Sequence, residues 1–389
     1  MMKPTMLYVS PFWPQRSGIS EYSETLVWGL KEFFDITILT KKKNIDNQSI
    51  KKEFPVQAYK ETEDYSGYDY IIYNFGNSPD NHDYMYEMIQ QYPGYVILHD
   101  FTLYYLTLMH YRNKGQMFQK IYELEGIKGL ITAKESIKES GIDDLIQHKH
   151  LPPELPLNKE VLRAAKGMIV HSNYVKEKIH AISQEIPVHK IELVDCMPEV
   201  NFTESDYLRN KYHFKEDDFI IGAVGMIAPS KQNEITCRAV DLYNNSHSKK
   251  VKYVMIGAGD YVDGLLNKNI VKTGFLENED FFAAVKSCDL IFNLRNPYNG
   301  ESSATLMQCM LMGKPCLVTD IGWFSELPDE CVDKVPVDVS AEELAKMIEN
   351  YQSGTVKGEA GKRFVSEQCN STVVAKSIAD FLEQMDKKK

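Results

Sequence analysis

The sequence has no apolar run long enough to cross a membrane, and its amino terminus lacks a basic stretch followed by an apolar one. A spanning helix needs about 20 consecutive apolar residues, and a secretory signal needs the basic-then-apolar pattern. The sequence therefore predicts a cytoplasmic protein. Three lysine clusters leave peripheral contact with the inner membrane face open, with solvated loops and a tail as the alternative: Lys41–Lys43, Lys51–Lys52 and Lys387–Lys389.

Cysteine is scarce and irregularly placed, with seven residues and no Cys-x-x-Cys pair. Disulfide frameworks and zinc sites need regular spacing, so these cysteines indicate reduced thiols and no metal site. The sequence has fewer basic than acidic residues: 44 Lys and Arg against 55 Asp and Glu, which gives a net charge of −11. That balance disfavours a nucleic-acid partner.

The chain is long, and strand-like and helix-like segments alternate along it. Its 389 residues suffice for two ordinary α/β domains. Short apolar runs alternate with helical patterns, which is typical of parallel sheets with crossover helices. The runs expected to form strands are residues 6–10, 33–40, 68–77, 94–101, 164–180 (a strand and then a helix), 190–200, 219–227, 251–259, 270–276, 288–295 and 314–322.

Polar residues 201–218 interrupt the alternation of apolar runs and helical patterns, which resumes at residue 219. The sequence therefore predicts an α/β fold with two doubly wound, Rossmann-like domains that face a cleft, over residues 1–200 and 201–389. Residues 102–150 lack strand signals and predict a helical insertion on the first domain. The tail from Val365 to Lys389 is helical in pattern, and we expect the last helix to pack back on the N-terminal domain.

In the second domain, Lys231 lies at a predicted helix start just after a strand. Helix N-termini favour phosphate, although a solvent-facing lysine fits the pattern equally well. Glu301, Ser302 and Ser303 lie at another predicted helix start. Plain capping explains these residues too, but Arg295 at the preceding strand end favours an anion pocket.

In the first domain, Gly18 lies in the first strand-to-helix loop, where it permits close backbone approach to a ligand or simply a tight turn. His99 and Asp100 end a predicted strand. A histidine there could relay a proton or bind a hydroxyl, but a lone histidine is more often structural. Three residues at another strand end would face the same cleft: Asn74, Gly76 and Asn77.

Taken together, these motifs resemble the retaining glycosyltransferases of sequence family 4, which have the GT-B architecture of two facing Rossmann-like domains. The likeness covers nearly the whole chain. It is carried by "PFWPQRSGISEYS", "YNFGNSPDNHDYMYEMIQQYPGYVILHD", "IVHSNYV", "GMIAPSKQNE" and "NGESSATLMQCMLMGKPCLVTDIGWFSELPD". The second and fifth motifs together resemble a subgroup found in bacterial surface-polysaccharide assembly.

The resemblance implies a hexosyltransferase that moves a sugar from a nucleotide-diphosphate sugar to a glycan, lipid-linked or protein-linked acceptor, with retention of configuration. It implies catalytic roles for His99, Lys231 and Glu301. Donor binding would fall to Gly18, Arg295, Lys231, Glu301, Ser302, Ser303 and Ala304. No Asp-x-Asp signature of the other large glycosyltransferase architecture occurs, so no metal or other cofactor is expected.

Two positions depart from the family pattern. Met226 replaces an arginine, and Cys309 replaces the second glutamate of the pair, which usually holds the nucleotide ribose. These departures keep open a catalytically degenerate partner or chaperone subunit, and the architecture also admits a nucleotide-sugar epimerase. A nicotinamide oxidoreductase is disfavoured because Gly257 and Gly259 lack the third glycine of the fingerprint, and we expect a tight turn there.

Overall fold

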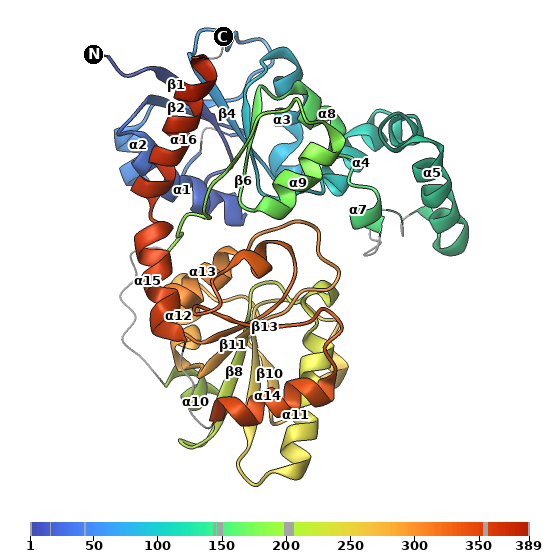
Figure 1. Ribbon diagram of the computed structural model, residues 1–389, viewed down its shortest axis with the longest axis vertical. Helices are drawn as coiled ribbons and strands as arrows, with labels where there is room; N and C mark the ends of the chain where they lie inside the picture. Colours follow the sequence, from blue (N-terminus) through green and yellow to red (C-terminus); the bar gives the residue numbers. More distant parts are fainter. Residues whose placement is uncertain are drawn as a thin grey trace. The chain divides into compact units, whose positions relative to one another are not determined.

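The computed structural model describes residues 2–15, 17–42, 44–142, 145, 151–197, 206–352 and 357–387. The chain forms two compact units (Figure 1). Unit 1 comprises Met1–Val194, Asn299–Ser302 and Cys369–Lys389, and unit 2 comprises Asp195–Tyr298 and Ser303–Gln368. The chain thus leaves unit 2 for the four residues Asn299–Ser302, and it returns to unit 1 at its end.

Unit 1 contains a seven-stranded parallel sheet in the order β3-β2-β1-β4-β5-β6-β7. The order reverses between β1 and β4, which makes this pair the topological switch point. The strands are β1 (Thr5–Val9), β2 (Asp35–Thr40), β3 (Val56–Ala58), β4 (Tyr70–Phe75), β5 (Tyr95–Leu98), β6 (Gly167–Val170) and β7 (Val188–Lys190).

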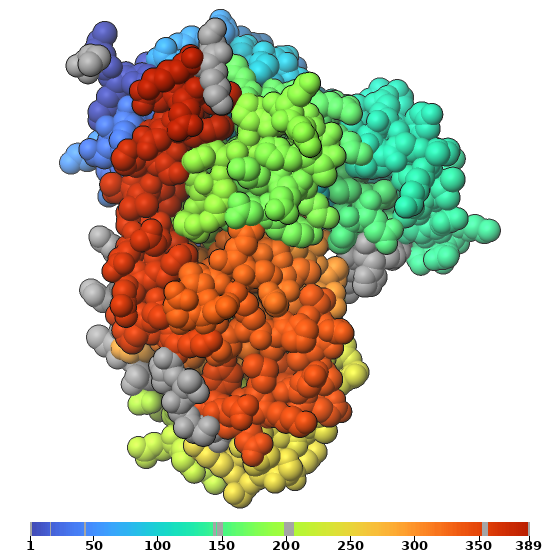
Figure 2. Space-filling view, viewed as in Figure 1, coloured from blue at the N-terminus to red at the C-terminus, as the bar shows by residue number. Residues whose placement is uncertain are grey.

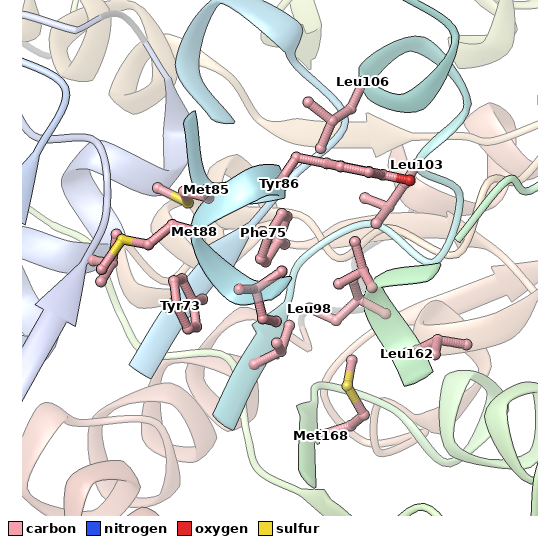
Figure 3. Close-up of a cluster of buried hydrophobic side chains, with 14 of the residues drawn as sticks. Tyr73, Phe75, Met85, Tyr86, Met88, Leu98, Leu103, Leu106, Leu162 and Met168 are labelled. Carbon is pink, nitrogen blue, oxygen red and sulfur yellow. The ribbon is translucent and has the colours of Figure 1, made fainter. Parts of the chain in front are cut away.

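Helices cover both faces of this sheet: α1 (Gly18–Leu30), α2 (Gln48–Glu53), α3 (Pro79–Gln91), α8 (Lys159–Ala164), α9 (Asn173–Ile182) and α16 (Ser371–Asp386). Figure 3 shows part of the core, where side chains of β4, β5 and α3 interdigitate. Helix α16 packs on α1 so closely that a Cβ at Gly29 would lie 2.2 Å from the carbonyl oxygen of Ser371.

The helical stretch after β5 forms α4 (Tyr104–Asn113) and α5 (Met117–Ser140), followed by the short α7 (Leu151–Glu154). These helices have a small apolar core of their own, which includes Tyr104, Ile121 and Leu155. Figure 1 shows α5 standing off to one side of the unit 1 sheet. Residues 143–144 and 146–150 of the predicted insertion lie outside the described residues.

Unit 2 contains a six-stranded parallel sheet in the order β10-β9-β8-β11-β12-β13, with its switch point between β8 and β11. The strands are β8 (Phe219–Val224), β9 (Val251–Ile256), β10 (Ile270–Lys272), β11 (Leu290–Asn293), β12 (Cys316–Thr319) and β13 (Asp333–Val335). The helices are α10 (Tyr207–Tyr212), α11 (Asn233–Ser246), α12 (Asn278–Ser287), α13 (Ala304–Leu311), α14 (Ala341–Gln352) and α15 (Gly358–Gln368), with 3-10 turns η1 (Pro229–Lys231), η2 (Asp263–Leu265) and η3 (Gly322–Glu326).

Most expected strands are present and the expected tail is helical, but one expected strand is missing and the tail has a break. The expected strand 190–200 is not found in its described part, because β7 ends at Lys190 and residues 191–197 form no strand, although Ile191, Leu193 and Val194 are buried. Residues 198–200 lie outside the described residues. The helical tail is broken between α15 and α16, where Asn370 caps the second helix through its side chain. The sequence reading also missed β3 and β13, which are three-residue edge strands.

The glycines after β9 are explained by a close approach of two loops. A Cβ at Gly257 would lie 2.0 Å from the carbonyl oxygen of Gly225, and one at Gly259 would lie 2.2 Å from that of Ile227. Backbone hydrogen bonds join the same loops, from Gly225 N to Ile256 O at 3.0 Å and from Ile227 N to Ala258 O at 2.7 Å. The glycine pair therefore fixes the loop after β8 against the loop after β9.

We predict that Gly257→Ala destabilises unit 2 by about 1–3 kcal/mol, because the new methyl group collides with backbone that cannot move without breaking these bonds. Urea unfolding of the full chain measures the change. Gly264→Ala is the matched control, since a Cβ there meets nothing within 4 Å. Equal unfolding midpoints for the two variants would contradict the close-approach account.

Candidate active site

In unit 1, the carboxyl ends of the central strands bring Asn74, His99 and Tyr22 together. Asn74 is fully buried near the end of β4, and its Oδ1 lies 3.2 Å from Nε2 of His99, which follows β5. The Tyr22 ring from α1 meets the His99 ring edge-on at a centroid distance of 4.5 Å. The His99 imidazole is therefore held on two sides at the switch-point edge of the sheet.

Two further buried histidines surround His99. The His171 ring, after β6, lies 5.2 Å from the His99 ring, and Nδ1 of His82, on α3, donates to Ser78 O at 2.9 Å. Burial lowers the pKa of His82 to about 4 and that of His171 to about 3. Burial, helped by these neighbours, also lowers the pKa of His99 well below its usual value. All three imidazoles are thus neutral near pH 7.

Asp100 follows His99 and lies near Glu301 of the Asn299–Ser302 loop. The pKa of Asp100 is raised to about 6, mainly because the carboxyl group is buried and also because the Glu301 carboxylate lies nearby. The hydrogen bond that Asn77 N donates to Asp100 Oδ2 acts in the opposite direction and lowers the pKa. Glu301 Oε2 accepts from Asn299 N at 2.9 Å.

The Asn299–Ser302 loop docks on the chain after β5. Thr102 N donates to Asn299 O at 3.3 Å. Gly300 has φ +83° and no room for a Cβ, which would lie 2.5 Å from Phe101 Cβ. This contact places Glu301 in the same unit as His99 and Asp100, although Glu301 lies some 200 positions further along the chain.

Of the three other candidates of unit 1, Asn77 and Gly76 have structural roles. Asn77 Oδ1 accepts from Tyr105 N at 2.8 Å and so caps the start of α4. The Cβ position at Gly76 is filled by Ile19 Cδ1 at 2.5 Å and lies 3.3 Å from Asp100 Oδ2, so Gly76 permits tight packing. Gly18 begins α1 after the Ser17 cap, and a Cβ there would meet nothing within 4 Å. Of these three, Gly18 borders open space.

Asp100 gives a pH-dependent stability prediction. A carboxyl with a raised folded-state pKa destabilises the fold when ionised, with a cost that is absent below about pH 4 and complete above about pH 6. Asp100→Asn should therefore stabilise the protein by about 1–2 kcal/mol at pH 8. The side-chain oxygen of the new asparagine can still accept the hydrogen bond from Asn77 N. Thermal unfolding at pH 4.5 and pH 8 checks this. A gain that is equal at both pH values would refute the assignment.

Asn74 gives a second prediction. A carboxylate in place of its Oδ1 would favour the charged imidazolium, so Asn74→Asp should raise the pKa of His99 from its lowered value. Histidine NMR titration of the full chain measures this shift. The control is Asn81→Asp on α3, whose amide bonds Ser78 Oγ instead. An unmoved His99 titration in Asn74→Asp, or an equal shift in the control, would contradict the contact.

In unit 2, Lys231 lies over the loop after β8. Its Nζ donates to Val224 O at 3.1 Å and lies 2.8 Å from the Cβ position of Gly225. Thr305, in the first turn of α13, lies on the same side, with Oγ1 3.8 Å from that position. The expected helix start is a 3-10 turn, and α11 begins two residues later, after Gln232 in the left-handed conformation.

The start of α13 is capped as the sequence allowed. Ser303 Oγ accepts from Leu306 N at 3.3 Å, and it also accepts from Asn293 Nδ2 at 3.4 Å, at the end of β11. Ser302 and Ala304 flank this cap and are partly exposed. The free main-chain N–H groups of a helix start carry partial positive charge.

Arg295, which was expected to bind the donor, is buried. It is only 5% exposed, its Nη1 donates to Leu294 O at 2.8 Å, and its guanidinium lies 5.3 Å from the centroid of the Phe324 ring. These contacts tie the strand end to η3. Lys231 is therefore the more accessible cation of the two.

An apolar cavity of about 540 Å³ adjoins the glycine loops of unit 2. Its lining combines backbone of the paired loops with large side chains: Gly225, Met226, Ile227, Ile256, Gly257, Ala258, Gly259, Phe275, Leu276 and Phe281. Met226 is 73% exposed at its rim. Exposed backbone beside apolar walls suits a flat heterocycle, which can stack and bond to main-chain groups.

Gln308 and Cys309 of α13 are both buried. Cys309 is fully buried, and burial raises the pKa of its thiol well above the usual value, so it offers nothing to a polar ligand. Gln308 lies on the α13 face of Ala304 and Thr305, and its Nε2 donates to Cys196 O at 3.1 Å.

The described residues contain no group of three or more His, Cys, Asp or Glu placed to hold a metal ion. Among the same residues, no helix is long and apolar enough to cross a membrane.

Comparison with known proteins links unit 2 to a family. Residues 218–353 match the family described as "Glycosyl transferases group 1". Comparison with curated protein sequences gave no significant match. The matched segment contains Lys231, the glycine loops, the cavity and the whole of α13.

Similar solved structures span nearly the whole chain. Sucrose-phosphate synthase from Thermosynechococcus elongatus is 13% identical at a TM-score of 0.64, covering 99% of this chain and 100% of its own. Anabaena HepE in complex with UDP-glucose is 15% identical at 0.65, covering 98% and 100%. WaaG, a glycosyltransferase of lipopolysaccharide biosynthesis, is 12% identical at 0.59, covering 97% and 99%.

At these identities the likeness shows the fold, and the predicted α/β class with two Rossmann-like, doubly wound units is confirmed. That the two units face a cleft stays a prediction. The family match over residues 218–353 and the likeness to glycosyltransferase structures support a glycosyltransferase.

Proposed function

We propose that the chain transfers a hexose from a nucleotide-diphosphate sugar to a glycan, lipid-linked or protein-linked acceptor, with retention of configuration, as a family 4 enzyme of bacterial surface-polysaccharide synthesis. Residues 201–389 would bind the donor and residues 1–200 the acceptor. The observation that carries the proposal is the grouping of Lys231, the paired glycine loops and the α13 start within the segment matched to group 1 glycosyltransferases.

The donor would occupy unit 2 in a defined order. Its base would lie in the apolar cavity beside Phe275. Its diphosphate would meet the Lys231 ammonium and the N–H groups at Ser302, Ser303 and Ala304. Anabaena HepE, which shares the fold, has been solved with UDP-glucose, and this supports a nucleotide-sugar donor.

Breaking the sugar–phosphate bond puts negative charge on the leaving diphosphate. The Lys231 cation and the α13 start would stabilise that charge without a metal. His99 would bond the transferred sugar as a neutral imidazole, and Glu301 would accept from the ring hydroxyls. Gly18 would let the start of α1 approach the diphosphate, and Arg295 would act behind Lys231.

We predict that Lys231→Ala lowers kcat for sugar transfer by about 100- to 1000-fold, the range for loss of one group that stabilises transition-state charge. Glu301→Ala should also lower the rate of transfer, because the transferred sugar loses the carboxylate that accepts from its hydroxyls. Transfer from a radiolabelled donor measures the rate. The exposed Lys249→Ala is the matched control and should keep the full rate. Full activity in either site variant would overturn the assignment.

A second candidate is a catalytically degenerate partner or chaperone subunit. It is favoured by the buried Cys309 thiol and by the uncharged, exposed Met226 at the cavity rim. Such a subunit would neither hydrolyse nor transfer any nucleotide sugar. An epimerase, by contrast, would convert the donor without an acceptor. We also propose a cytoplasmic location with peripheral contact at the inner membrane face, where a lipid-linked acceptor would be reached.

A further inference from the structure

The helical insertion returns to the unit 1 sheet through a short stretch with unusual backbone geometry. Leu157 has φ 49°, in the left-handed region that a bulky side chain rarely adopts. Its N–H donates to Glu125 Oε1 of α5 at 3.1 Å, and its carbonyl oxygen accepts from Thr107 Oγ1 of α4 at 2.9 Å. Figure 2 shows the teal helices of the insertion beside the green part of unit 1 that follows this stretch. The insertion therefore holds the backbone of Leu157 in place.

Asn158 lies directly before α8, at the position where asparagine commonly caps a helix through its side-chain oxygen. No such cap bond is made. The side chain is fully buried, its Nδ2 donates to Phe101 O at 2.6 Å, and its Oδ1 has no hydrogen-bond partner within the described part of the chain. The lost cap and the buried, unpaired acceptor both lower stability. The bond to Phe101 is therefore the contribution that this side chain makes.

Phe101 supports the loop that carries Glu301. A Cβ at Gly300 would lie 2.5 Å from Phe101 Cβ, so the loop can dock this closely only with a glycine there. The next residue, Thr102, donates its N–H to the Asn299 carbonyl oxygen at 3.3 Å. The buried asparagine amide therefore holds the backbone on which this loop docks.

The docked loop brings the Glu301 carboxylate close to Asp100, the residue that precedes Phe101. This carboxylate is one of two causes that raise the pKa of Asp100, and burial is the larger one. The hydrogen bond from Asn77 N lowers the same pKa. Because the interaction between two charges weakens with their separation, the pKa of Asp100 reports whether the loop is docked.

We propose that Asn158 is a positioning residue for Glu301. Its amide fixes the Phe101 carbonyl, and the fixed backbone seats the loop so that the Glu301 carboxylate lies beside Asp100. A misplacement of about 1 Å in a group that contacts substrate can lower a rate about 100-fold, so a bond at this distance from the substrate can govern the rate of transfer. The contact of Glu301 with a sugar rests on the proposed function, whereas the seating of its loop does not.

The test replaces Asn158 with leucine, which has a similar shape and no donor. Carboxyl NMR titration of the full chain should show the pKa of Asp100 lowered by about as much as in Glu301→Gln, because the loop moves away with its charge. Asn244→Leu is the matched control, since this asparagine is also buried and donates to a backbone carbonyl, Val251 O at 2.9 Å, in unit 2. The control should leave the titration of Asp100 as in the wild type.

Sugar transfer gives a second measurement. Asn158→Leu should lower kcat about 10- to 100-fold, the range for a displaced group that contacts substrate. In a Glu301→Ala background the same substitution should cause no further loss, because the group that it positions is already gone. A purely structural defect would instead lower the rate by the same factor in both backgrounds.

A pKa of Asp100 that stays raised in Asn158→Leu, or that falls equally in Asn244→Leu, would overturn the proposal. Asn158→Ala removes the same donor without new bulk and gives the same test if the leucine variant does not fold, which thermal unfolding shows. A lowered pKa of Asp100 together with undiminished sugar transfer would support the positioning role and would refute the catalytic role proposed for Glu301.

Discussion

Each sheet reverses its strand order once, and this constraint places nearly every candidate group. Parallel strands on either side of the reversal send their connections to opposite faces, so the carboxyl ends between them stay open. In unit 1 that edge holds Asn74 and His99, and in unit 2 it holds Lys231 and the start of α13. The glycine loops after β8 and β9 remain open but rigid there because their backbones bond directly to one another.

The two edges differ in charge. Unit 1 surrounds its site with imidazoles that burial keeps neutral and with the carboxyl groups of Asp100 and Glu301. Unit 2 offers an ammonium group, a helix start and an apolar cavity. Hydroxyl-rich ligands suit the first environment, and a diphosphate joined to a flat base suits the second. This division is the physical basis on which we propose sugar contacts for unit 1 and nucleotide binding for unit 2.

The sequence predicted what depends on local pattern. Alternating apolar runs and helical stretches are sufficient for two parallel sheets, and the Ser303 cap follows from a serine before an apolar helix. Contacts between residues far apart in the sequence could not be predicted from it. The backbone contact that explains Gly257 needs the loop after β8, and the burial of Arg295 needs Phe324. The described part of the run 190–200 was mispredicted because Leu193 and Val194 are buried beyond the end of edge strand β7 and do not belong to a strand.

The most direct measurement is hydrogen–deuterium exchange of the full chain with and without nucleoside diphosphates, UDP first. If the open edge of unit 2 is the donor site, one nucleotide should slow exchange in 225–231, in 257–259 and around Phe275, whose backbone or side chains line the cavity or hold Lys231. The matched edge strands, β3 and β13, should exchange as before. Protection by no nucleoside diphosphate, or protection confined to segments away from these loops, would contradict the account.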